Sequence, residues 1–401
     1  MKILHTSDWH LGASLGTQKR YEETEKILAW LCETLKNEDV RALLIAGDIF
    51  DTGLPPNQAT ELYYRFLAKL QTTNVKNIIV VAGNHDSATY MDAPAEVLKH
   101  LNVRVFGKTT PENPERHLVP LKNDDGSIAA IIAAIPYPRD RDIRQAISGE
   151  GVAEQLKNRL DCIVSLYQNI CSRAAELYPG KPLIATGHLY ISGGRVSLDK
   201  EIGTLNGISL AALPENIDYL ALGHLHIPQK IDGKINCYYS GSLLDMNFTD
   251  DPSHKKVLLL ESSSLKEPPK ELEIPCFQKM EKISGDLEYI FTRLDELIAQ
   301  KESVWLHVEN SGDFEPSLQY KLSEKCKDTA LLLISCNNLR PNPAVLKLKP
   351  ASAQKLDELT PEQVFERLLN QQEYSKEVKA SLLTAFQTAI NELKDEDTNA
   401  H

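Results

Sequence analysis

The sequence contains no long uninterrupted run of apolar residues. Its longest apolar stretch, from Ile128 to Ile135, is far shorter than the roughly 18 residues that a membrane-spanning helix needs. An N-terminal secretion signal is not expected either, because Met1 leads directly into an apolar segment whose end already carries a candidate functional residue, Asp8. We therefore expect a cytoplasmic protein without a membrane segment.

The sequence also lacks cysteine pairs and an excess of positive charge. Its seven cysteines are scattered, their number is odd and none forms a Cys-x-x-Cys pair, which argues against a disulfide framework or a zinc knuckle. The 44 Lys and Arg residues stand against 56 Asp and Glu residues, so the net charge is −12. A broad basic surface is therefore not expected, and a nucleic acid would have to be held locally or by a partner.

The pattern of apolar residues predicts an α/β fold for residues 1–275. Short apolar runs alternate with helical patterns at about 17–37, 57–72 and 93–101, which favours parallel strands joined by helices. A surface loop is expected at 109–116 and a long helix at 155–177, and strands dominate from 183 to 260. The whole fits two packed β-sheets flanked by helices.

Two further regions are predicted beyond this α/β domain. Residues 276–340 read as strand, helix, strand, helix and strand, with helices at 287–300 and 317–327, and should form a small α/β capping domain. Three prolines mark a linker at 341–359.

The C-terminal region, residues 360–395, is expected to be helical. Thr360 as N-cap and Pro361 as first helical residue start the first helix. Two apolar stripes follow: Val364, Phe365, Leu368 and Leu369, then Val378, Leu382, Leu383, Phe386, Ile390 and Leu393.

Five short motifs are the most informative feature, and each follows an apolar run that reads as a β-strand. They are Asp8-Trp9-His10, Gly47-Asp48, Gly83-Asn84-His85-Asp86, Gly187-His188 and Gly223-His224-Leu225-His226. Taken singly, each could be a turn or a structural histidine. Together they hold five of the chain's 11 histidines, a clustering that folding does not require. In open α/β sheets, ligands bind where strands end.

Seven side chains in these motifs are good ligands for first-row metal ions. They are Asp8, His10, Asp48, Asn84, His188, His224 and His226. The set is too large for one tetrahedral ion. It suits two ions that share one carboxylate, the equipment of a two-metal phosphoester hydrolase. Oxygen and nitrogen ligands suit Mn²⁺ better than metals that prefer soft ligands.

The motifs together resemble those of the calcineurin-like metallophosphoesterases. The resemblance is carried by residues 5–12, 47–51, 83–86 and 223–226. With Pro228-Gln229 and Ser240-Gly241-Ser242, it narrows to the SbcD family of bacterial nuclease subunits and covers most of residues 1–275. The chain departs from that family at Ile227, where a basic residue is frequent, and at Leu243, where proline is frequent; neither is a predicted ligand.

The resemblance implies how two manganese ions would be held. One ion would take Asp8, His10, Asp48 and His226, and the other would take Asp48, Asn84, His188 and His224, so that Asp48 bridges them.

Two further residues are candidate catalytic groups. His85 follows a ligand and is assigned to stabilising the transition state or protonating the leaving alkoxide. Asp51 either orients His85 or forms an Asx-turn before Thr52-Gly53.

The implied activity is that of a dinuclear-metal deoxyribonuclease, a 3′→5′ exonuclease on duplex ends and an endonuclease on single-stranded and hairpin DNA. The resemblance places it in DNA repair, recombination and replication. It also implies a homodimer, for which the helices at 57–72 and 93–101 are candidate surfaces, and an SbcC-like SMC ATPase bound through the C-terminal helices.

Two other functions fit the same predicted site less well. A phosphomonoesterase, protein phosphatase or cyclic-nucleotide phosphodiesterase is less favoured, because residues 47–53 lack the Arg of a Gly-Asp-x-x-Asp-Arg-Gly motif. A non-catalytic scaffold is less favoured because all seven ligands are present.

Overall fold

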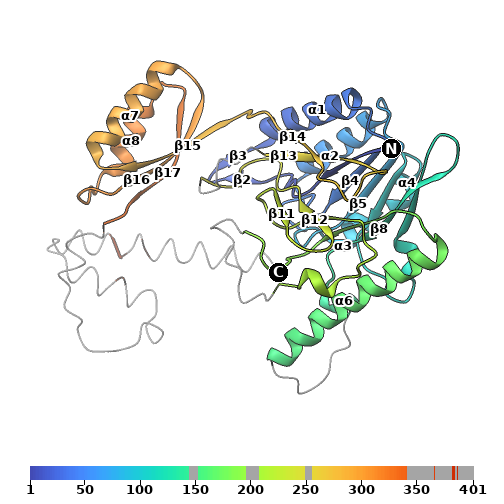
Figure 1. Cartoon of the computed structure of the whole chain (residues 1–401). Coiled ribbons are helices and arrows are strands. Elements are labelled where there is room, and N and C mark those ends of the chain that lie inside the picture. Colours follow the sequence, from blue (N-terminus) through green and yellow to red (C-terminus); the bar gives the residue numbers. More distant parts are fainter. Residues whose placement is uncertain are drawn as a thin grey trace. The chain divides into compact units, whose positions relative to one another are not determined.

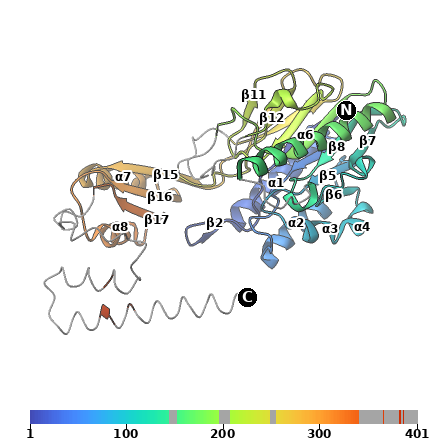
Figure 2. The same ribbon diagram turned by 90° about the horizontal axis from the view of Figure 1, so that it is seen from below.

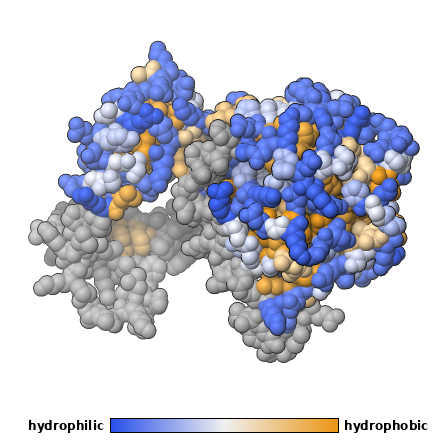
Figure 3. All heavy atoms as spheres, in the orientation of Figure 1, coloured by the Kyte–Doolittle hydropathy of each residue, from blue (hydrophilic) through white to orange (hydrophobic). Residues whose placement is uncertain are grey.

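A computed structural model of the chain describes residues 1–143, 152–195, 207–248 and 255–340, with Phe365, Leu382, Leu383 and Phe386. The chain divides after Arg340 into two compact units. Hydrophilic residues predominate on the face of the first unit shown in Figure 3. Among the described residues, no helix has the length and apolar character that crossing a membrane requires.

The first of two six-stranded sheets has the strand order β14-β13-β1-β4-β5-β6. Four of its strands are parallel: β1 (Lys2–Thr6), β4 (Ala42–Ala46), β5 (Asn77–Val81) and β6 (Val103–Phe106). The antiparallel strands β13 (Lys256–Glu261) and β14 (Lys270–Glu273) complete one side. The three apolar runs that precede the motifs of residues 8–86 are thus confirmed as neighbouring parallel strands.

The second sheet has the order β11-β12-β10-β9-β8-β7. Its parallel strands are β8 (Ile128–Ile135), β9 (Leu183–His188), β10 (Tyr219–Gly223) and β12 (Asn236–Tyr239). Antiparallel β7 (Leu118–Lys122) and β11 (Gln229–Ile231) form its two edges. The motifs of residues 187–226 therefore follow two adjacent parallel strands.

The two sheets pack face to face, and helices cover their outer faces. Because successive side chains on a strand point to opposite faces, Ile3 and Leu44 pack between the sheets, whereas Leu4 and Leu43 pack under helices. Helices α1 (Tyr21–Asn37) and α2 (Asn57–Leu70) cover the first sheet, and α6 (Val152–Leu177) covers the second (Figures 1 and 2). This confirms the predicted architecture of two packed sheets flanked by helices.

Residues 279–338 form the small α/β domain with a core of its own. Its three parallel strands are β15 (Lys279–Gly285), β16 (Val304–Asn310) and β17 (Leu331–Asn338). Helices α7 (Leu287–Gln300) and α8 (Leu318–Cys326) lie on one side of this sheet (Figure 1). The predicted order of elements is confirmed.

The helix expected at 17–37 starts late. A two-stranded hairpin, β2 (Ser14–Leu15) and β3 (Gln18–Lys19), comes first, and the helix begins at Tyr21. Gly16, at φ +57°, forms the turn between these strands.

Short helices and 3-10 turns modify the prediction at several points between residues 88 and 212. The helix expected at 93–101 is α4 (Ala95–Lys99), preceded by the separate α3 (Ala88–Asp92), with Pro94 between them. The expected loop at 109–116 includes the start of a 3-10 turn, η1 (Pro114–His117). Helix α5 (Asp140–Ile143) follows β8, and a second 3-10 turn, η2 (Leu210–Ala212), precedes β10.

The predicted linker at 341–359 lies outside the described residues, as do most of residues 360–395. Phe365 and Phe386, one from each predicted apolar stripe, are helical, and their rings stack with centroids 4.1 Å apart.

Candidate active site

All five motifs meet at one edge of the molecule, where the parallel strands of both sheets end. Four of the predicted ligands have positive φ angles: Asp8 (50°), His10 (45°), Asp48 (49°) and His224 (105°). Such a conformation costs a non-glycine residue about 1–3 kcal/mol and tends to persist at functional sites. The strained main chain is therefore independent support for a site at this edge.

The glycines of the motifs allow the loops to approach each other closely. A Cβ atom on Gly83 would lie 2.1 Å from Oδ1 of Asp48. One on Gly47 would lie 2.3 Å from Nδ1 of His188. A larger residue at either position would push a predicted ligand out of place.

The first group of possible ligands consists of Asp8, His10 and His226, all buried. Nε2 of His10 and Nε2 of His226 are 3.1 Å apart, and Nε2 of His226 is 3.9 Å from Oδ1 of Asp8. Two ring nitrogens and a carboxylate oxygen thus converge on one point from the ends of β1 and β10.

The second group centres on His188. Its Nε2 atom lies 3.2 Å from Oδ2 of Asp48 and 3.0 Å from Oδ1 of Asn84. The same Asn84 oxygen is 3.0 Å from Nδ1 of His224. Nδ1 of His188 donates a hydrogen bond to the carbonyl oxygen of Ala46 (2.9 Å), which leaves Nε2 unprotonated in the neutral ring and available as a ligand.

Asp48 lies between the two groups. Among the described residues no hydrogen bond reaches its buried Oδ2 atom, which lies 3.6 Å from Nε2 of His10 and 3.2 Å from Nε2 of His188. Burial would raise the pKa of Asp48, but His188 and His10 outweigh burial and hold that pKa well below its usual value. Burial would lower the pKa of His10 and that of His188. Nearby carboxylates outweigh burial, first among them Asp51 for His10 and Asp48 for His188, so both pKa values are raised above the usual value.

These buried clusters fit a dinuclear metal site. Oxygen and imidazole donors in this number satisfy two divalent cations, and the anionic Oδ2 of Asp48, between two histidines, is placed as a bridging ligand would be.

His85 lies against both the metal-ligand cluster and Asp51. Its main-chain N–H donates to Oδ1 of Asp48 (2.9 Å), and its ring is edge-on to that of His10, with centroids 4.9 Å apart. Its Nδ1 donates to the main-chain carbonyl of Asp51 (2.8 Å). The ring is therefore oriented by main chain.

Asp51 is predicted either to orient His85 or to form a turn with Thr52-Gly53. Its main-chain carbonyl accepts the hydrogen bond from Nδ1 of His85, and its carboxylate lies in one cluster with His85 and His10. Oδ1 of Asp51 is 3.2 Å from Nδ1 of His10, so the carboxylate also supports a predicted metal ligand, a contact that the motif did not indicate.

Asp86 is a supporting residue that the sequence reasoning did not single out. Its buried carboxylate accepts hydrogen bonds from the main-chain N–H groups of Ile49 (3.1 Å), Phe50 (2.9 Å) and Gly83 (2.8 Å). It thereby ties the loop after β4 to the loop after β5. Its position as the last residue of the Gly-Asn-His-Asp motif could have identified it from the sequence.

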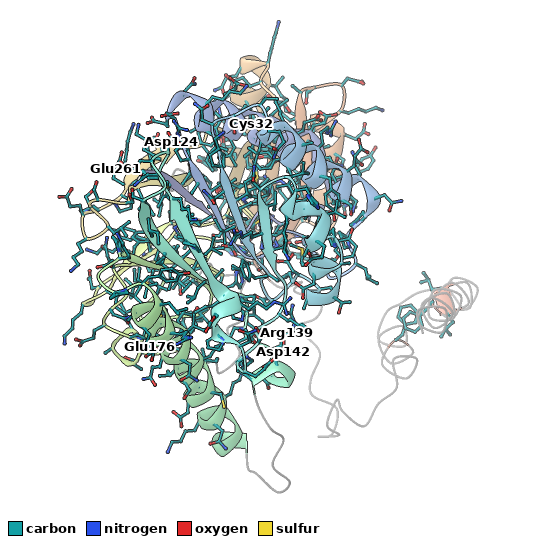
Figure 4. The ribbon with its side chains drawn as sticks, turned by 90° about the vertical axis from the view of Figure 1, so that its right-hand side faces the viewer. Cys32, Asp124, Arg139, Asp142, Glu176 and Glu261 are labelled. Carbon is teal, nitrogen blue, oxygen red and sulfur yellow. The ribbon has the colours of Figure 1, made fainter. Side chains whose placement is uncertain are left out.

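Arg139 performs a similar task from the second sheet. It follows β8 at the strand ends, across the molecule from Asp124 and Glu261 (Figure 4). Its guanidinium donates to the carbonyl oxygens of Gly83 (3.2 Å), Asp86 and Gly107 (3.4 Å). The sequence feature that could have identified Arg139 is its position after the apolar run of β8. That strand end, Tyr137-Pro138-Arg139, carries no residue type that binds metals, so it did not stand out.

Two more residues support ligands directly. Ser7 donates to Oδ2 of Asp8 (2.5 Å). The buried amino group of Lys255 donates to the carbonyl of His226 and to Oγ of Ser242, both at 3.1 Å. Lys255 belongs to no motif, and nothing in the sequence marks it.

Comparison with known proteins agrees with this geometry. Residues 1–228 match the calcineurin-like phosphoesterase family, and residues 276–373 match the type 5 capsule protein repressor C-terminal domain. The SbcD subunit of the nuclease SbcCD from Escherichia coli K12 is 33% identical, over 99% of both chains.

Two further relatives have the same description. The SbcD subunit from Rhodobacter capsulatus is 32% identical over 91% of this chain and 93% of its own. The Bacillus subtilis protein is 29% identical over 77% of this chain and 78% of its own. Fold, strand-end clusters and full-length similarity agree, and the chain belongs to the calcineurin-like phosphoesterases and, within them, to the SbcD family of nuclease subunits.

Proposed function

We propose that the chain is a Mn²⁺-dependent deoxyribonuclease that hydrolyses phosphodiester bonds at the strand-end cluster. The observation that carries the proposal is Asp48, whose buried Oδ2 faces His10 on one side and His188 on the other. In this proposal Asp8, His10, Asp48 and His226 hold one ion, and Asp48, Asn84, His188 and His224 hold the other.

The residues of the chain have separate tasks in this reaction. Two bound divalent cations would activate water and neutralise charge on the phosphate. Ala46 and Ser7 fix ligand orientation through their contacts with His188 and Asp8. His85 donates through Nδ1 to Asp51, so its Nε2 is the atom that can hold or deliver a proton to the leaving oxygen.

Two observations favour a nuclease over a phosphomonoesterase. The relatives that match most of the chain are described as nucleases. The segment Gly47–Gly53 lacks the Arg that monoesterases of this fold place after the second Asp. We propose 3′→5′ exonuclease activity on duplex ends and endonuclease activity on single-stranded and hairpin DNA, in cytoplasmic DNA repair, recombination and replication.

The relatives are described as one subunit of the nuclease SbcCD, so a second protein is part of the proposal. We place the SbcC-like SMC ATPase on the helices of residues 360–395, beyond a linker at 341–359, and assign residues 276–340 to a cap that guides DNA. Short helices are marginal alone in water and need a surface on which to bury apolar side chains. Phe365 and Phe386 cover each other, and Leu382 is 37% exposed. A homodimer through residues 57–72 and 93–101 completes the assembly.

The activity is tested by adding Mn²⁺ and the purified protein to end-labelled duplex DNA and, in parallel, to p-nitrophenyl phosphate. We expect shortening of the DNA from its 3′ ends and little release of p-nitrophenol. Hydrolysis of the monoester with intact DNA would overturn the proposal in favour of a phosphomonoesterase.

The partner site is tested by truncation after Pro350. All predicted ligands lie before residue 227, so Mn²⁺-dependent cleavage of short single strands should remain. Co-elution with the ATPase in size-exclusion chromatography and ATP-stimulated duplex degradation should be lost. Unimpaired co-elution would show that the C-terminal helices belong to the chain's own core.

A further inference from the structure

A hollow beside β6 gathers basic side chains outside the metal-ligand cluster. Its volume is about 390 Å³. The cationic residues that line it are Lys76, Lys99, Arg104, Lys108 and Arg116. Two carboxylates line it as well, but Glu96 pairs with Lys99 (2.5 Å) and Asp92 accepts a hydrogen bond from the main chain of Gly107 (2.8 Å). Such a concentration of positive charge contrasts with the net charge of −12.

Four of the five cations have no hydrogen-bonded or salt-bridged partner within the part of the chain that the structure describes, although Arg116 adds to the effect of Lys99 in lowering the pKa of Glu96. There, neither a hydrogen bond nor a salt bridge reaches the side chains of Lys76, Arg104, Lys108 and Arg116, and all four are exposed. Like charges held together in one hollow raise the local potential and attract an anion with several charges.

An aromatic side chain lines the same hollow. Phe106 is half-buried, and its ring is tilted by 30° against the ring of His117, with centroids 5.9 Å apart. Packing against a buried histidine holds this ring in place. A cationic groove with a fixed aromatic ring is the combination with which proteins bind single-stranded nucleic acid, because phosphates meet the cations and a base stacks on the ring.

Strand β6, which lines the hollow, is hydrogen-bonded to the segment that leads into the loop carrying Asn84. The carbonyl of Phe106 accepts a hydrogen bond from the N–H of Ala82 (2.9 Å), and Ala82 is two residues from Asn84. Arg139 bonds to the carbonyls of both Gly107 and Gly83. A strand that leaves the metal-ligand cluster past Gly107 would therefore run along β6 toward the hollow.

We propose that the hollow beside β6 binds an unpaired nucleic acid strand next to the phosphodiester that is cut. Arg104 and Lys108, which lie outside the residues 93–101 proposed for the dimer surface, bind its phosphates, and Phe106 stacks on a base. This inference rests on the proposed nuclease function and adds a subsite to it. It gives an acidic chain its own local contact with DNA.

The test is fluorescence anisotropy of full-length protein with a labelled oligothymidylate of about 12 nucleotides, a length within the range of known single-strand sites. Ca²⁺ replaces Mn²⁺ to limit cleavage, and KCl is varied. The variant is Arg104→Ala/Lys108→Ala. The control, Lys157→Ala/Lys181→Ala, removes the same charge from exposed lysines that have no described salt bridge.

We expect the variant to bind about 10-fold more weakly at low salt. The slope of log affinity against log salt should fall by about 1.4, because each single-strand phosphate that is no longer neutralised lowers the slope by ~0.7. The control should bind like the wild type. A variant with wild-type affinity and slope would overturn the proposal, and so would an equal loss in variant and control, because that would be an effect of net charge alone. Displacement of the oligonucleotide by an equal concentration of dTMP would also overturn it, since a strand would then not be required.

Hydrolysis of bis(p-nitrophenyl) phosphate with Mn²⁺ separates this proposal from the nuclease function. That substrate is too short to reach the hollow, so the variant should hydrolyse it at the wild-type rate. A wild type that hydrolyses neither it nor DNA would overturn the nuclease function itself. An active wild type whose variant binds oligonucleotide normally would overturn only the hollow beside β6.

Discussion

The two sheets are built alike but bring different chemistry to the shared edge. Each has four neighbouring parallel strands. The first adds β13 and β14 on one side through antiparallel pairings, and the second adds one antiparallel strand at each edge. The first sheet contributes every oxygen donor among the predicted ligands and one imidazole: Asp8, His10, Asp48 and Asn84. The second contributes imidazoles alone: His188, His224 and His226. The negative charge that attracts cations thus comes from one sheet, and most of the neutral donors that complete their coordination come from the other.

Neither sheet holds a site by itself. The contacts that define both groups of ligands cross between the sheets, as between His10 and His226 and between Asp48 and His188. The packing of the two sheets is therefore part of the metal site, and cation binding should stabilise that packing by mass action.

The largest expected effect comes from removing the carboxylate of the first sheet. Asp48→Ala should reduce hydrolysis to background and abolish paired Mn²⁺ binding, because both predicted ions share Asp48. Removing one imidazole of the second sheet, with His224→Ala, should weaken only one ion. Isothermal titration with Mn²⁺ measures both variants. Two Mn²⁺ sites of unchanged affinity in Asp48→Ala would contradict the bridging role. Equal losses of Mn²⁺ binding in both variants would show that the two sheets do not differ in this respect.

The next effect concerns a residue of the first sheet that is predicted not to be a ligand. His85→Ala should keep both ions and lose ~10²–10⁴-fold in kcat, the range typical of general acid–base groups. The main-chain hydrogen bond from residue 85 to Asp48 survives in this variant. Its counterpart is Asp51→Ala, which should weaken metal binding more than proton transfer, because the Asp51 carboxylate faces His10. Loss of an ion in His85→Ala would make His85 a ligand.

The sequence predicted the ligand loops because two local signals coincide there. Apolar runs mark the strands, and metal-binding residue types follow at their ends, so Asp8 and His188 could be placed at one edge from the sequence alone. Asp86, Arg139 and Lys255 act through main-chain groups of distant segments, and residue type does not reveal such partners. The hairpin of residues 14–19 was missed because strands of two residues show no period.

Arg139 tests how much the second sheet supports the oxygen donors of the first. Arg139→Met removes hydrogen bonds to the carbonyls of Gly83 and Asp86, on either side of Asn84 and His85. Partners of this kind typically contribute 10–100-fold, so we expect kcat and Mn²⁺ affinity to fall by roughly that factor. Arg139→Lys should restore little, because one ammonium cannot reach three carbonyls.

The matched control for Arg139 is Arg173→Met. Arg173 lies on α6, contacts none of the predicted ligand loops through its described ion pairs, and pairs with Glu115 and Glu176 at the surface. It should leave kcat and Mn²⁺ affinity unchanged. A change confined to KM in Arg139→Met would show that Arg139 does not support the loop. An equal fall of kcat and Mn²⁺ affinity in Arg139→Met and Arg173→Met would show the same.

The smallest effect concerns the contact between the sheets themselves. His5 on β1 is fully buried, and its ring nitrogens lie 3.3 Å from the hydroxyl of Tyr219 and 3.1 Å from the carbonyl of Leu222, both on β10. Burial lowers the pKa of His5 from 6.5 to about 3, partly offset by the hydrogen bond to Leu222. Between these two values the unfolded chain binds a proton that the folded chain excludes, so the stability that neutral His5 contributes is present above pH 6.5 and is lost as pH falls. Each pH unit costs at most about 1.4 kcal/mol of stability.

Between pH 7 and pH 5, His5→Gln should therefore lose about 1–2 kcal/mol less free energy of unfolding in urea than the wild type, measured without metal. His100→Gln, a change at an exposed histidine, should follow the wild type. Parallel pH dependence in wild type and His5→Gln would mean that His5 is protonated in the folded protein, and the two sheets would then be joined at this point by a charged contact.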